Sequence, residues 1–219
     1  MTHEFKTPIS TIAISADVLI QKETVNNPQR ILNYASIIKE ENERLRSQVE
    51  RVLQMASIEK SEFKLKKEKL DVHEEIKKVA QNFDATLKKQ QAIVQFNFSA
   101  VNSIIEADKV HFVNVIYNLL DNALKYTEKT PDILISTENL ENQLILKIKD
   151  NGIGIAPEFQ KKVFDKFFRV PTGNIHNVKG FGLGLDYVKN IVKSHKWKIQ
   201  LKSEIGEGTE FVITILQAR

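Results

Sequence analysis

The amino-acid sequence predicts an α+β protein in which an N-terminal two-helix hairpin is followed by an α/β sandwich. Three observations predict this fold. Apolar residues recur with a 4-3 spacing over residues 3–56, whereas the chain from residue 71 onward interleaves helical stripes with alternating strand patterns. All eight glycines lie between Gly152 and Gly208. We therefore divide the chain into a hairpin over residues 1–58, a linker over 59–70 and a second domain over 71–219.

Composition excludes several classes of protein. With 42% hydrophobic and 27% charged residues, the chain can bury an ordinary core and is neither disordered nor embedded in a membrane. The sequence has no apolar run of about 20 residues and no signal peptide, so we expect a soluble chain. The absence of cysteine excludes disulfides and thiolate metal sites. The net charge of +4 is spread among glutamates, which argues against binding to nucleic acid.

The N-terminal part reads as two amphipathic helices separated by residues 23–28. Asn26, Asn27 and Pro28 end the first helix and allow the second to begin. Asn42 falls at a seam position, where a polar residue commonly fixes register. Two helices cannot enclose a core, so we expect a homodimer that forms a four-helix bundle. The apolar seam consists of Phe5, Ile9, Ile12, Ala16, Leu19, Ile31, Ala35, Ile38, Leu45, Val49, Val52 and Ala56.

The linker is rich in lysine and carries a short edge strand, and the α/β pattern begins after it. Asp71 and Glu74 form a capping box that opens a helix with a buried stripe from Val72 to Leu87. Asp108 caps a second helix, which runs through Ile116 to Leu124. A third helix covers residues 186–195. We expect strands at residues 93–98, 103–106, 133–137, 144–149, 198–203 and 210–216.

Seven of the eight glycines form three clusters, at residues 152–154, 180–184 and 206–208. Because glycine lacks a Cβ, its backbone N–H groups can approach phosphate oxygens closely, which suggests a phosphate-bearing ligand. The spacing matches neither the dinucleotide fingerprint nor the Walker A motif. We expect a mobile loop over residues 169–181, followed by a helix whose N-terminus presents amides to a triphosphate.

Two pairs of polar residues can recognise such a nucleotide. Asp150 ends a strand before a tight turn, where its carboxylate can accept the exocyclic amine of adenine with support from Thr209. Taken alone, the Asp150-Asn151-Gly152 segment also fits a simple hairpin turn. Asn118 and Asn122 lie one helical turn apart and can bind Mg²⁺ through neutral oxygens, although ordinary surface amides show the same spacing.

His3 is a candidate phosphate acceptor because it lies off the apolar seam and is therefore exposed. Glu4 can hydrogen-bond one imidazole nitrogen and increase the nucleophilicity of the other. Thr7 lies on the same helical face and can orient a water, while Pro8 bends the helix. Taken alone, an exposed histidine is usually only an ordinary surface residue. The four other histidines lack ligand spacing, so we assign no metal to them.

In this order and spacing, six segments resemble the catalytic core of bacterial two-component sensor histidine kinases, and the resemblance covers essentially the whole chain. The segments are His3 to Pro8 (H box), Asn118 to Thr127 (N box), Asp150 to Ile155 (G1 box), Phe164 to Arg169 (F box), Gly180 to Leu185 (G2 box) and Gly206 to Phe211 (the last glycine box).

The resemblance implies a histidine phosphotransfer and dimerisation hairpin joined to an ATP-binding domain of the type shared with gyrase, mismatch-repair and heat-shock ATPases. By this resemblance ATP and Mg²⁺ are the cofactors, His3 takes the γ-phosphate and Glu4 is the general base. A response regulator then receives the phosphate on an aspartate, and Glu4 and Thr7 also match the pattern for phosphatase activity toward that regulator. The implied nucleotide site comprises Asn122 as the Mg²⁺ ligand, Asn118, Lys125, Tyr126, Asp150, Gly152, Gly154, Arg169, Gly180, Gly182, Gly184 and Thr209.

Family members normally carry further helix, a sensor region and membrane spans before the histidine, whereas only Met1 and Thr2 precede it here. We therefore expect a fragment, the cytoplasmic portion of an inner-membrane sensor protein. Two other functions are weighed against this one. An ATPase of the same superfamily would need no H box, and a nucleotide-binding dimeric scaffold would not need both the asparagine pair and Asp150 with Gly152.

Overall fold

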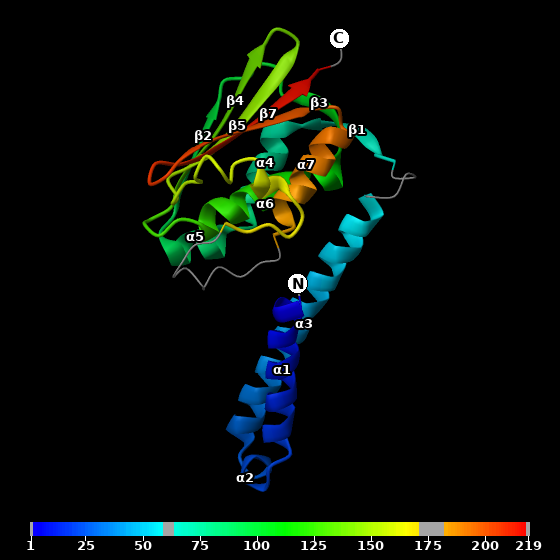
Figure 1. The fold of residues 1–219 in the computed structure, drawn as a ribbon, viewed down its shortest axis with the longest axis vertical. Helices are drawn as coiled ribbons and strands as arrows, with labels where there is room; N and C mark the ends of the chain where they lie inside the picture. Colours follow the sequence, from blue (N-terminus) through cyan, green and yellow to red (C-terminus); the bar gives the residue numbers. More distant parts are fainter. Residues whose placement is uncertain (1, 59–63, 171–181, 218–219) are drawn as a thin grey trace. The chain divides into compact units, whose positions relative to one another are not determined.

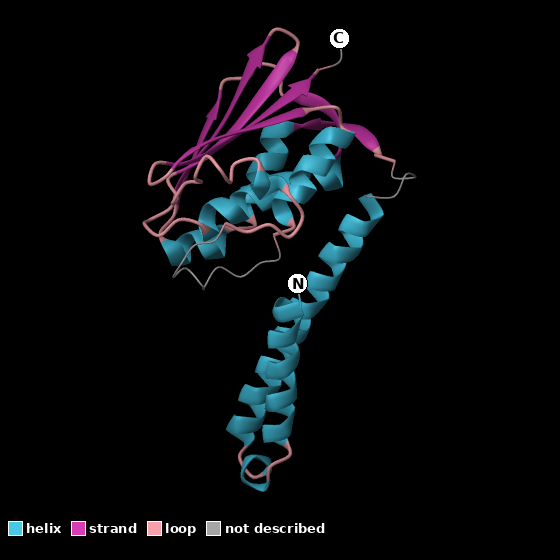
Figure 2. Cartoon of the chain, viewed as in Figure 1, coloured by secondary structure: helices cyan, strands magenta, loops and turns pink. Residues whose placement is uncertain are grey.

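The computed structural model describes the backbone of residues 2–58, 64–170 and 182–217, and most of their side chains. The chain divides into two compact units, Met1–Ser61 and Glu62–Arg219 (Figure 1). The first unit is helical and the second holds all the strands that the structure describes (Figure 2). The predicted α+β class is confirmed.

The first unit is a helical hairpin of α1 (Thr2–Leu19) and α3 (Pro28–Ile58), joined by one additional turn, α2 (Lys22–Val25). The sequence did not predict α2. The side chain of Asn27 accepts a hydrogen bond from the backbone N–H of Arg30 at 3.1 Å, and Pro28 is the first residue of α3. A capping oxygen followed by proline in the first position starts a helix without leaving its first N–H groups unsatisfied.

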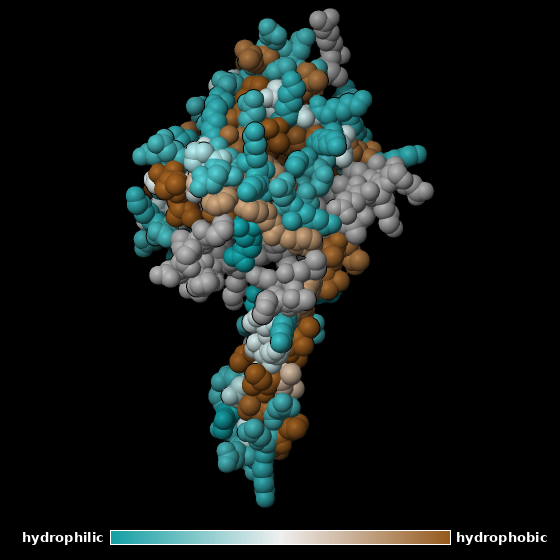
Figure 3. Space-filling model, in the orientation of Figure 1, coloured by the Kyte–Doolittle hydropathy of each residue, from teal (hydrophilic) through white to brown (hydrophobic). Residues whose placement is uncertain are grey.

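The hairpin buries only part of its apolar surface within one chain. On α1, Pro8 and Ser15 are buried, whereas Ile9 is 54% exposed although the 4-3 spacing placed it on the seam. Figure 3 shows hydrophobic side chains gathered along the hairpin. Asn42, predicted at the seam, is exposed. The large apolar residues exposed on the hairpin are Ile9, Ile14, Ile20, Val25, Ile31, Leu32, Ile37, Val49 and Leu53.

The second unit packs helices on one face of a five-stranded mixed sheet (Figures 1 and 2). The strand order is β2-β4-β5-β7-β6, in which β2 pairs with β4 in parallel and the other pairs are antiparallel. A separate antiparallel pair joins β1 to β3. The strands are β1 (Lys67–Asp71), β2 (Ile93–Phe98), β3 (Ile104–Asp108), β4 (Asp132–Leu140), β5 (Gln143–Asp150), β6 (Lys198–Glu204) and β7 (Gly208–Leu216). The helices are α4 (Val72–Gln81), α5 (Asp84–Gln90), α6 (Lys109–Lys125), the 3₁₀ turn η1 (Lys162–Phe164) and α7 (Gly184–Ser194).

The predicted helix starts at Asp71 and Asp108 are confirmed, whereas the first of these helices is shorter than predicted. Asp71 accepts hydrogen bonds from the N–H groups of His73 and Glu74, and Asp108 accepts one from His111. The sequence predicted one helix as far as Leu87, but α4 ends at Gln81 and α5 begins at Asp84. Phe83 lies between the two helices, where its buried ring packs 4.7 Å from the ring of Tyr117 on α6. The N–H of Phe83 donates to the carbonyl of Ala80 at 3.0 Å, so the backbone makes a tighter turn between the two helices.

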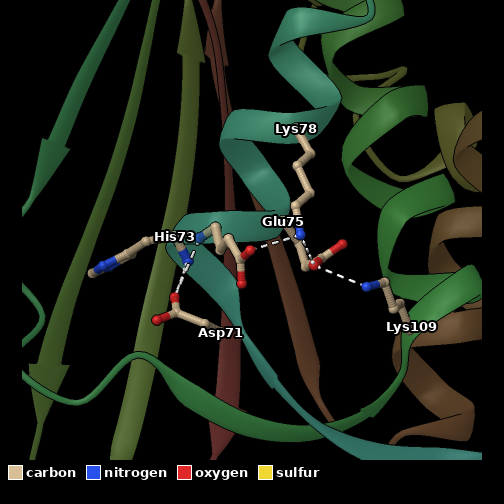
Figure 4. Close-up of polar contacts among 6 residues, drawn as sticks. Asp71, His73, Glu75, Lys78 and Lys109 are labelled. Atoms are coloured by element: carbon tan, nitrogen blue, oxygen red, sulfur yellow. Dashed lines mark hydrogen bonds and ion pairs between the residues drawn. The ribbon is translucent and has the colours of Figure 1, made fainter.

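An ion pair joins α4 to the first residue of α6 (Figure 4). Glu75 is only 4% exposed, and its carboxylate lies 3.1 Å from the amine of Lys78 and 3.0 Å from that of Lys109. Burial alone would raise the pKa of Glu75, but the hydrogen bonds and charges of the two lysines outweigh it and lower the pKa. The helix that carries Asn118 and Asn122 is thereby held against α4.

Candidate functional site

Asp150 is the buried carboxylate at the end of β5, next to the loop that carries Gly152. Its Oδ1 accepts hydrogen bonds from the backbone N–H of Gly152 at 2.8 Å and of Thr209 at 3.1 Å. Burial raises the pKa of Asp150, and the two N–H groups oppose that shift. No hydrogen bond to Oδ2 is found among the residues that the structure describes, so this oxygen can accept one from a ligand.

The glycine loops pack on one another around Asp150. The N–H of Ile153 donates to the carbonyl of Tyr126 at 2.9 Å, and the N–H of Gly206 donates to the carbonyl of Ile153 at 2.9 Å. The end of α6, the G1 segment and the last glycine segment therefore meet at one place. Gly152 lies against the carbonyl of Tyr126, where a Cβ would come within 2.6 Å.

Two glycines of this cluster have backbone conformations that other residues rarely adopt. Gly154 and Gly208 have φ values of +72° and +103°. A Cβ on Gly154 would lie 1.9 Å from the carbonyl oxygen of Glu204, and one on Gly208 would lie 2.0 Å from that of Asp150. Both conformation and close approach therefore require glycine here.

Asn118 on α6 lies beside the first residue of α7. Its Nδ2 donates to the carbonyl of Asn114 at 2.7 Å, and its Oδ1 lies 2.8 Å from where a Cβ on Gly184 would be. Asn122 is half-buried one turn further along the same helix. Neutral amide oxygens beside a helix N-terminus suit Mg²⁺ bound to phosphates, because this ion keeps several waters and binds few protein ligands. The asparagine pair therefore fits the ion that the sequence suggested.

Lys125, Tyr126 and Arg169 lie near the end of α6. The amine of Lys125 pairs with Asp121 on the preceding turn of the helix. Burial raises the pKa of Tyr126, and the positive charge of Arg169 lowers it in part, so the two side chains are near one another. Gly182 meets the F box, since its carbonyl accepts a hydrogen bond from the N–H of Phe167 at 3.0 Å.

Some of the predicted residues lie in the first unit or outside the described residues. His3 and Glu4 lie in the first turn of α1, but their side chains are outside the described residues. Thr7 is described and exposed on α1. Gly180 and most of the predicted loop are also outside the described residues.

Two residues that the sequence interpretation missed support the Asp150 cluster. Ser203 on β6 contacts Gly208, Thr209 and Ile155 through its hydroxyl. Gln160 donates from Nε2 to the carbonyl of Ile155 at 3.0 Å and of Ser203 at 2.8 Å. Gly206, in the turn between β6 and β7, could have revealed Ser203, because a short hairpin turn sets which residues face one another.

No helix among the described residues is long and apolar enough to cross a membrane. The same residues contain no cluster of three or more histidine, cysteine or acidic side chains that could hold a metal ion. The asparagine pair lies outside that definition, because its oxygens belong to amides.

Comparison with known proteins gives two family matches. Residues 1–61 match the family model of the His Kinase A (phospho-acceptor) domain. Residues 107–219 match that of the histidine kinase-, DNA gyrase B-, and HSP90-like ATPase. The second match alone covers more than half of the chain and contains the Asp150 cluster and the asparagine pair.

Individual proteins agree with these matches. The chain is 46% identical to the sensor protein RprX of Bacteroides fragilis over 217 residues, which are 98% of this chain and 42% of the relative. It is 33% identical to the sensor protein SrrB of Staphylococcus aureus over 98% of this chain and 36% of the relative. The chain thus spans less than half the length of both.

A solved structure of histidine kinase ThkA in complex with response regulator protein TrrA has the same fold, with a TM-score of 0.74 and 24% identity. The match covers 99% of this chain and 60% of that one. Family matches over both units and the sensor protein relatives lead to one conclusion. The chain belongs to the sensor histidine kinases, and it is the catalytic core of such an enzyme, with a phospho-acceptor domain followed by an ATP-binding domain.

Proposed function

We propose that this enzyme binds ATP with Mg²⁺ around Asp150, transfers the γ-phosphate to His3 and passes it to an aspartate of a response regulator. The observation that carries the nucleotide part is the Asp150 carboxylate, buried at the sheet end with Oδ1 held by two backbone N–H groups. A carboxylate fixed in this way can read the exocyclic amine of adenine with its other oxygen. The histidine part is supported by the phospho-acceptor family match, which contains His3.

The transfer itself needs few protein groups. One imidazole nitrogen of His3 forms a bond to the γ-phosphorus while the bond from that phosphorus to the oxygen of ADP breaks. The proton on the other nitrogen passes to Glu4, which acts as the general base. Phosphoryl transfer depends mainly on positioning and on neutralisation of charge.

The remaining site residues hold the nucleotide. Asn122, assisted by Asn118, would hold Mg²⁺, which neutralises charge on the phosphates when bound. Lys125, Tyr126 and Arg169 contact the phosphates or the nucleotide, and Thr209 supports the base. Gly152, Gly154, Gly180, Gly182 and Gly184 shape the pocket and the loop over it.

The partners follow from the exposed surface and the fold neighbour. The apolar residues exposed on the hairpin support a homodimer in which two hairpins form a four-helix bundle. ThkA, which has the same fold, was solved with a response regulator, and this supports a regulator as the phosphate acceptor here. Glu4 and Thr7 would also serve the reverse reaction, dephosphorylation of the regulator.

We also propose functional boundaries and a location. Residues 1–58 form the dimerisation and phosphotransfer hairpin, residues 59–70 the linker and residues 71–219 the catalytic domain. The relatives are longer sensor proteins, which supports the interpretation that this chain is the cytoplasmic portion of an inner-membrane sensor.

Incubation with γ-labelled ATP and Mg²⁺ tests the proposal. We expect acid-labile, base-stable label on the protein, and none on the His3→Gln variant. The control is that this variant still binds ATP, because its nucleotide site is intact. Label that survives His3→Gln refutes His3 as the acceptor. Release of phosphate from ATP without labelled protein would instead favour an ATPase, and binding without either product a scaffold.

A further inference from the structure

Three polar side chains lie in a row across the end of the sheet. β5, β7 and β6 are neighbours, and their register pairs Asp150 with Thr209 and Thr209 with Ser203. Residues directly opposite one another in antiparallel strands point to the same face of the sheet. This face is the one covered by helices. Ile148, two residues before Asp150 on β5, and Phe211, two residues after Thr209 on β7, point to the same face and are buried.

The hydrogen bonds of Ser203 determine the direction of the Thr209 hydroxyl. Ser203 Oγ lies 2.7 Å from the carbonyl oxygen of Gly208, 2.8 Å from the backbone nitrogen of Ile155 and 2.9 Å from Oγ1 of Thr209. A hydroxyl has one hydrogen and two lone pairs. The carbonyl can only accept, so it takes the hydrogen, and the N–H can only donate, so it takes one lone pair.

The remaining lone pair of Ser203 must therefore accept the hydrogen of Thr209. With its only hydrogen directed at Ser203, Thr209 offers nothing but lone pairs to any other group. Gln160 keeps this arrangement in place, because its Nε2 bridges the carbonyls of Ile155 and Ser203.

We propose that Ser203 is a specificity-determining residue, which makes Thr209 a hydrogen-bond acceptor beside the acceptor Asp150 and so selects a 6-amino purine over a 6-oxo purine. The inference rests on the proposed nucleotide site around Asp150. The amine of adenine offers two hydrogens to these oxygens. The 6-oxo group of hypoxanthine or guanine offers none and would place its lone pairs against those of Asp150 and Thr209, an arrangement that a buried site disfavours.

The test compares ATP with ITP, which differ only at position 6 and in the hydrogen on N1. Each nucleotide displaces trinitrophenyl-ATP from the whole chain. The readout is the dissociation constant of ITP divided by that of ATP, which measures the preference for ATP. In Ser203→Ala, the Thr209 hydroxyl is released and can donate to a 6-oxo group. We expect the preference for ATP to fall at least about fivefold, mainly through tighter ITP binding.

Four further variants separate an effect on specificity from general damage to the protein. Thr209→Val alone should reduce the preference for ATP over ITP. The double variant Ser203→Ala/Thr209→Val should show the same preference as Thr209→Val. Ser203→Thr keeps the hydroxyl and should keep the ratio. Ser99→Ala is the matched control, because Ser99 also donates to a carbonyl, that of Thr137 at 2.8 Å, beyond the end of β2 on the other edge of the sheet.

An unchanged ratio in a Ser203→Ala protein that still binds ATP overturns the inference and leaves the proposed function standing. An equal change of the ratio in Ser99→Ala has the same meaning, as does an effect of Ser203→Ala on the ratio that persists when residue 209 is Val. If Ser203→Ala does not fold, an unchanged ratio in Thr209→Val overturns the inference. Failure of the unaltered chain to bind trinitrophenyl-ATP or ATP refutes the nucleotide site itself.

Discussion

The backbone N–H of Thr209 donates to Oδ1 of Asp150 at 3.1 Å, although the two residues are 59 positions apart in the sequence. The contact joins the G1 segment to the last glycine segment, and the N–H of Gly152 shares the same oxygen. Because both N–H groups bind Oδ1, the carboxylate cannot rotate without losing them. Its orientation is therefore set before any ligand binds, which reduces the free energy needed to order the site.

Asp150→Asn should separate stability from nucleotide binding. The amide oxygen can still accept from Gly152 and Thr209, but Nδ2 would then point a donor at the adenine amine. Since burial raises the pKa of Asp150, its charged form is disfavoured in the folded protein, and a neutral amide should leave the free energy of unfolding unchanged or higher. ATP affinity should fall at least about tenfold.

Thermal unfolding and ATP titration at neutral pH measure the two effects. Asp84→Asn, which changes an exposed carboxylate at the start of α5, is the control and should leave ATP affinity unaltered. Equal ATP affinity in Asp150→Asn and in the unaltered protein would contradict the assigned role of Asp150.

Alanine at Gly208 should be far more destabilising than alanine at Gly206. Both glycines have positive φ, +103° and +83°, so each substitution costs about 1–2 kcal/mol of backbone strain. At Gly206 a Cβ would meet no atom within 4 Å, but at Gly208 it would lie 2.0 Å from the carbonyl oxygen of Asp150. We expect Gly208→Ala to cost at least about 2 kcal/mol more in urea unfolding. Equal losses would show that the close approach is not essential.

Breaking the ion pair of Glu75 should destabilise the second unit (Figure 4). Lys109→Met leaves the buried carboxylate with Lys78 as its remaining partner. The expected loss is about 1–2 kcal/mol, less than for a fully buried pair because the lysine is partly exposed. Lys189→Met is the control, since that amine lies 4.0 Å from Asp165 and both side chains are exposed. A similar loss in both variants, measured by urea unfolding, would argue against a special role for Glu75.

The same carboxylate predicts an acid dependence of stability. Its pKa is lowered in the folded protein, so its contribution is complete above the ordinary glutamate pKa of 4.5 and is lost as the pH falls through the lowered value. Glu75→Gln should therefore flatten the free energy of unfolding in this acidic range. Parallel pH profiles of the variant and the unaltered protein would contradict the prediction.

His195 predicts a second pH dependence, nearer neutrality. Its Nε2 accepts from the N–H of Asp108 at 3.0 Å and its Nδ1 donates to the carbonyl of Ile191 at 2.9 Å, so only the neutral ring satisfies both contacts. Burial lowers its pKa, and the charges of Lys67 and His111 act in the same direction, whereas the hydrogen bond to Ile191 and the charge of Asp108 oppose the shift. The unfolded chain then takes up a proton near pH 6.5 that the folded protein does not.

Stability should accordingly fall as the pH drops below about 6.5, by up to about 1.4 kcal/mol per pH unit for this group until its folded pKa is reached. His195→Asn should remove this part of the slope in urea unfolding between neutral and mildly acidic pH. Part of the slope should remain in this variant, because burial also lowers the pKa values of His73 and His111. A slope that His195→Asn does not alter would contradict the assignment.

Much of the fold could be predicted because its elements depend on local patterns. The strand at residues 93–98 has the predicted bounds, and Asp71 and Asp108 cap helices as expected. The split at Phe83 was not predicted, because a buried Phe83 also fits the apolar stripe of one continuous helix. The additional turn α2 was also missed, since one helical turn is too short to produce a periodic pattern.

In the candidate site, too, some residues could be predicted from the sequence and others could not. Residue type and spacing selected Asp150, the asparagine pair and the glycine clusters as candidates, because only certain side chains can bind a base, an ion or a phosphate. Ser203 and Gln160 were missed, since serine and glutamine are common and their roles depend on which segments they touch.

The sequence by itself determined most of the order of helices and strands, the helix caps at Asp71 and Asp108 and the chemistry available at each motif, because these depend on neighbours within a few residues. Only the tertiary structure decided that Oδ1 of Asp150 is held from Gly152 and Thr209, and that Ser203 directs the hydroxyl of Thr209. The physical reason is that such contacts depend on strand order and register, which bring distant segments together to within the length of a hydrogen bond.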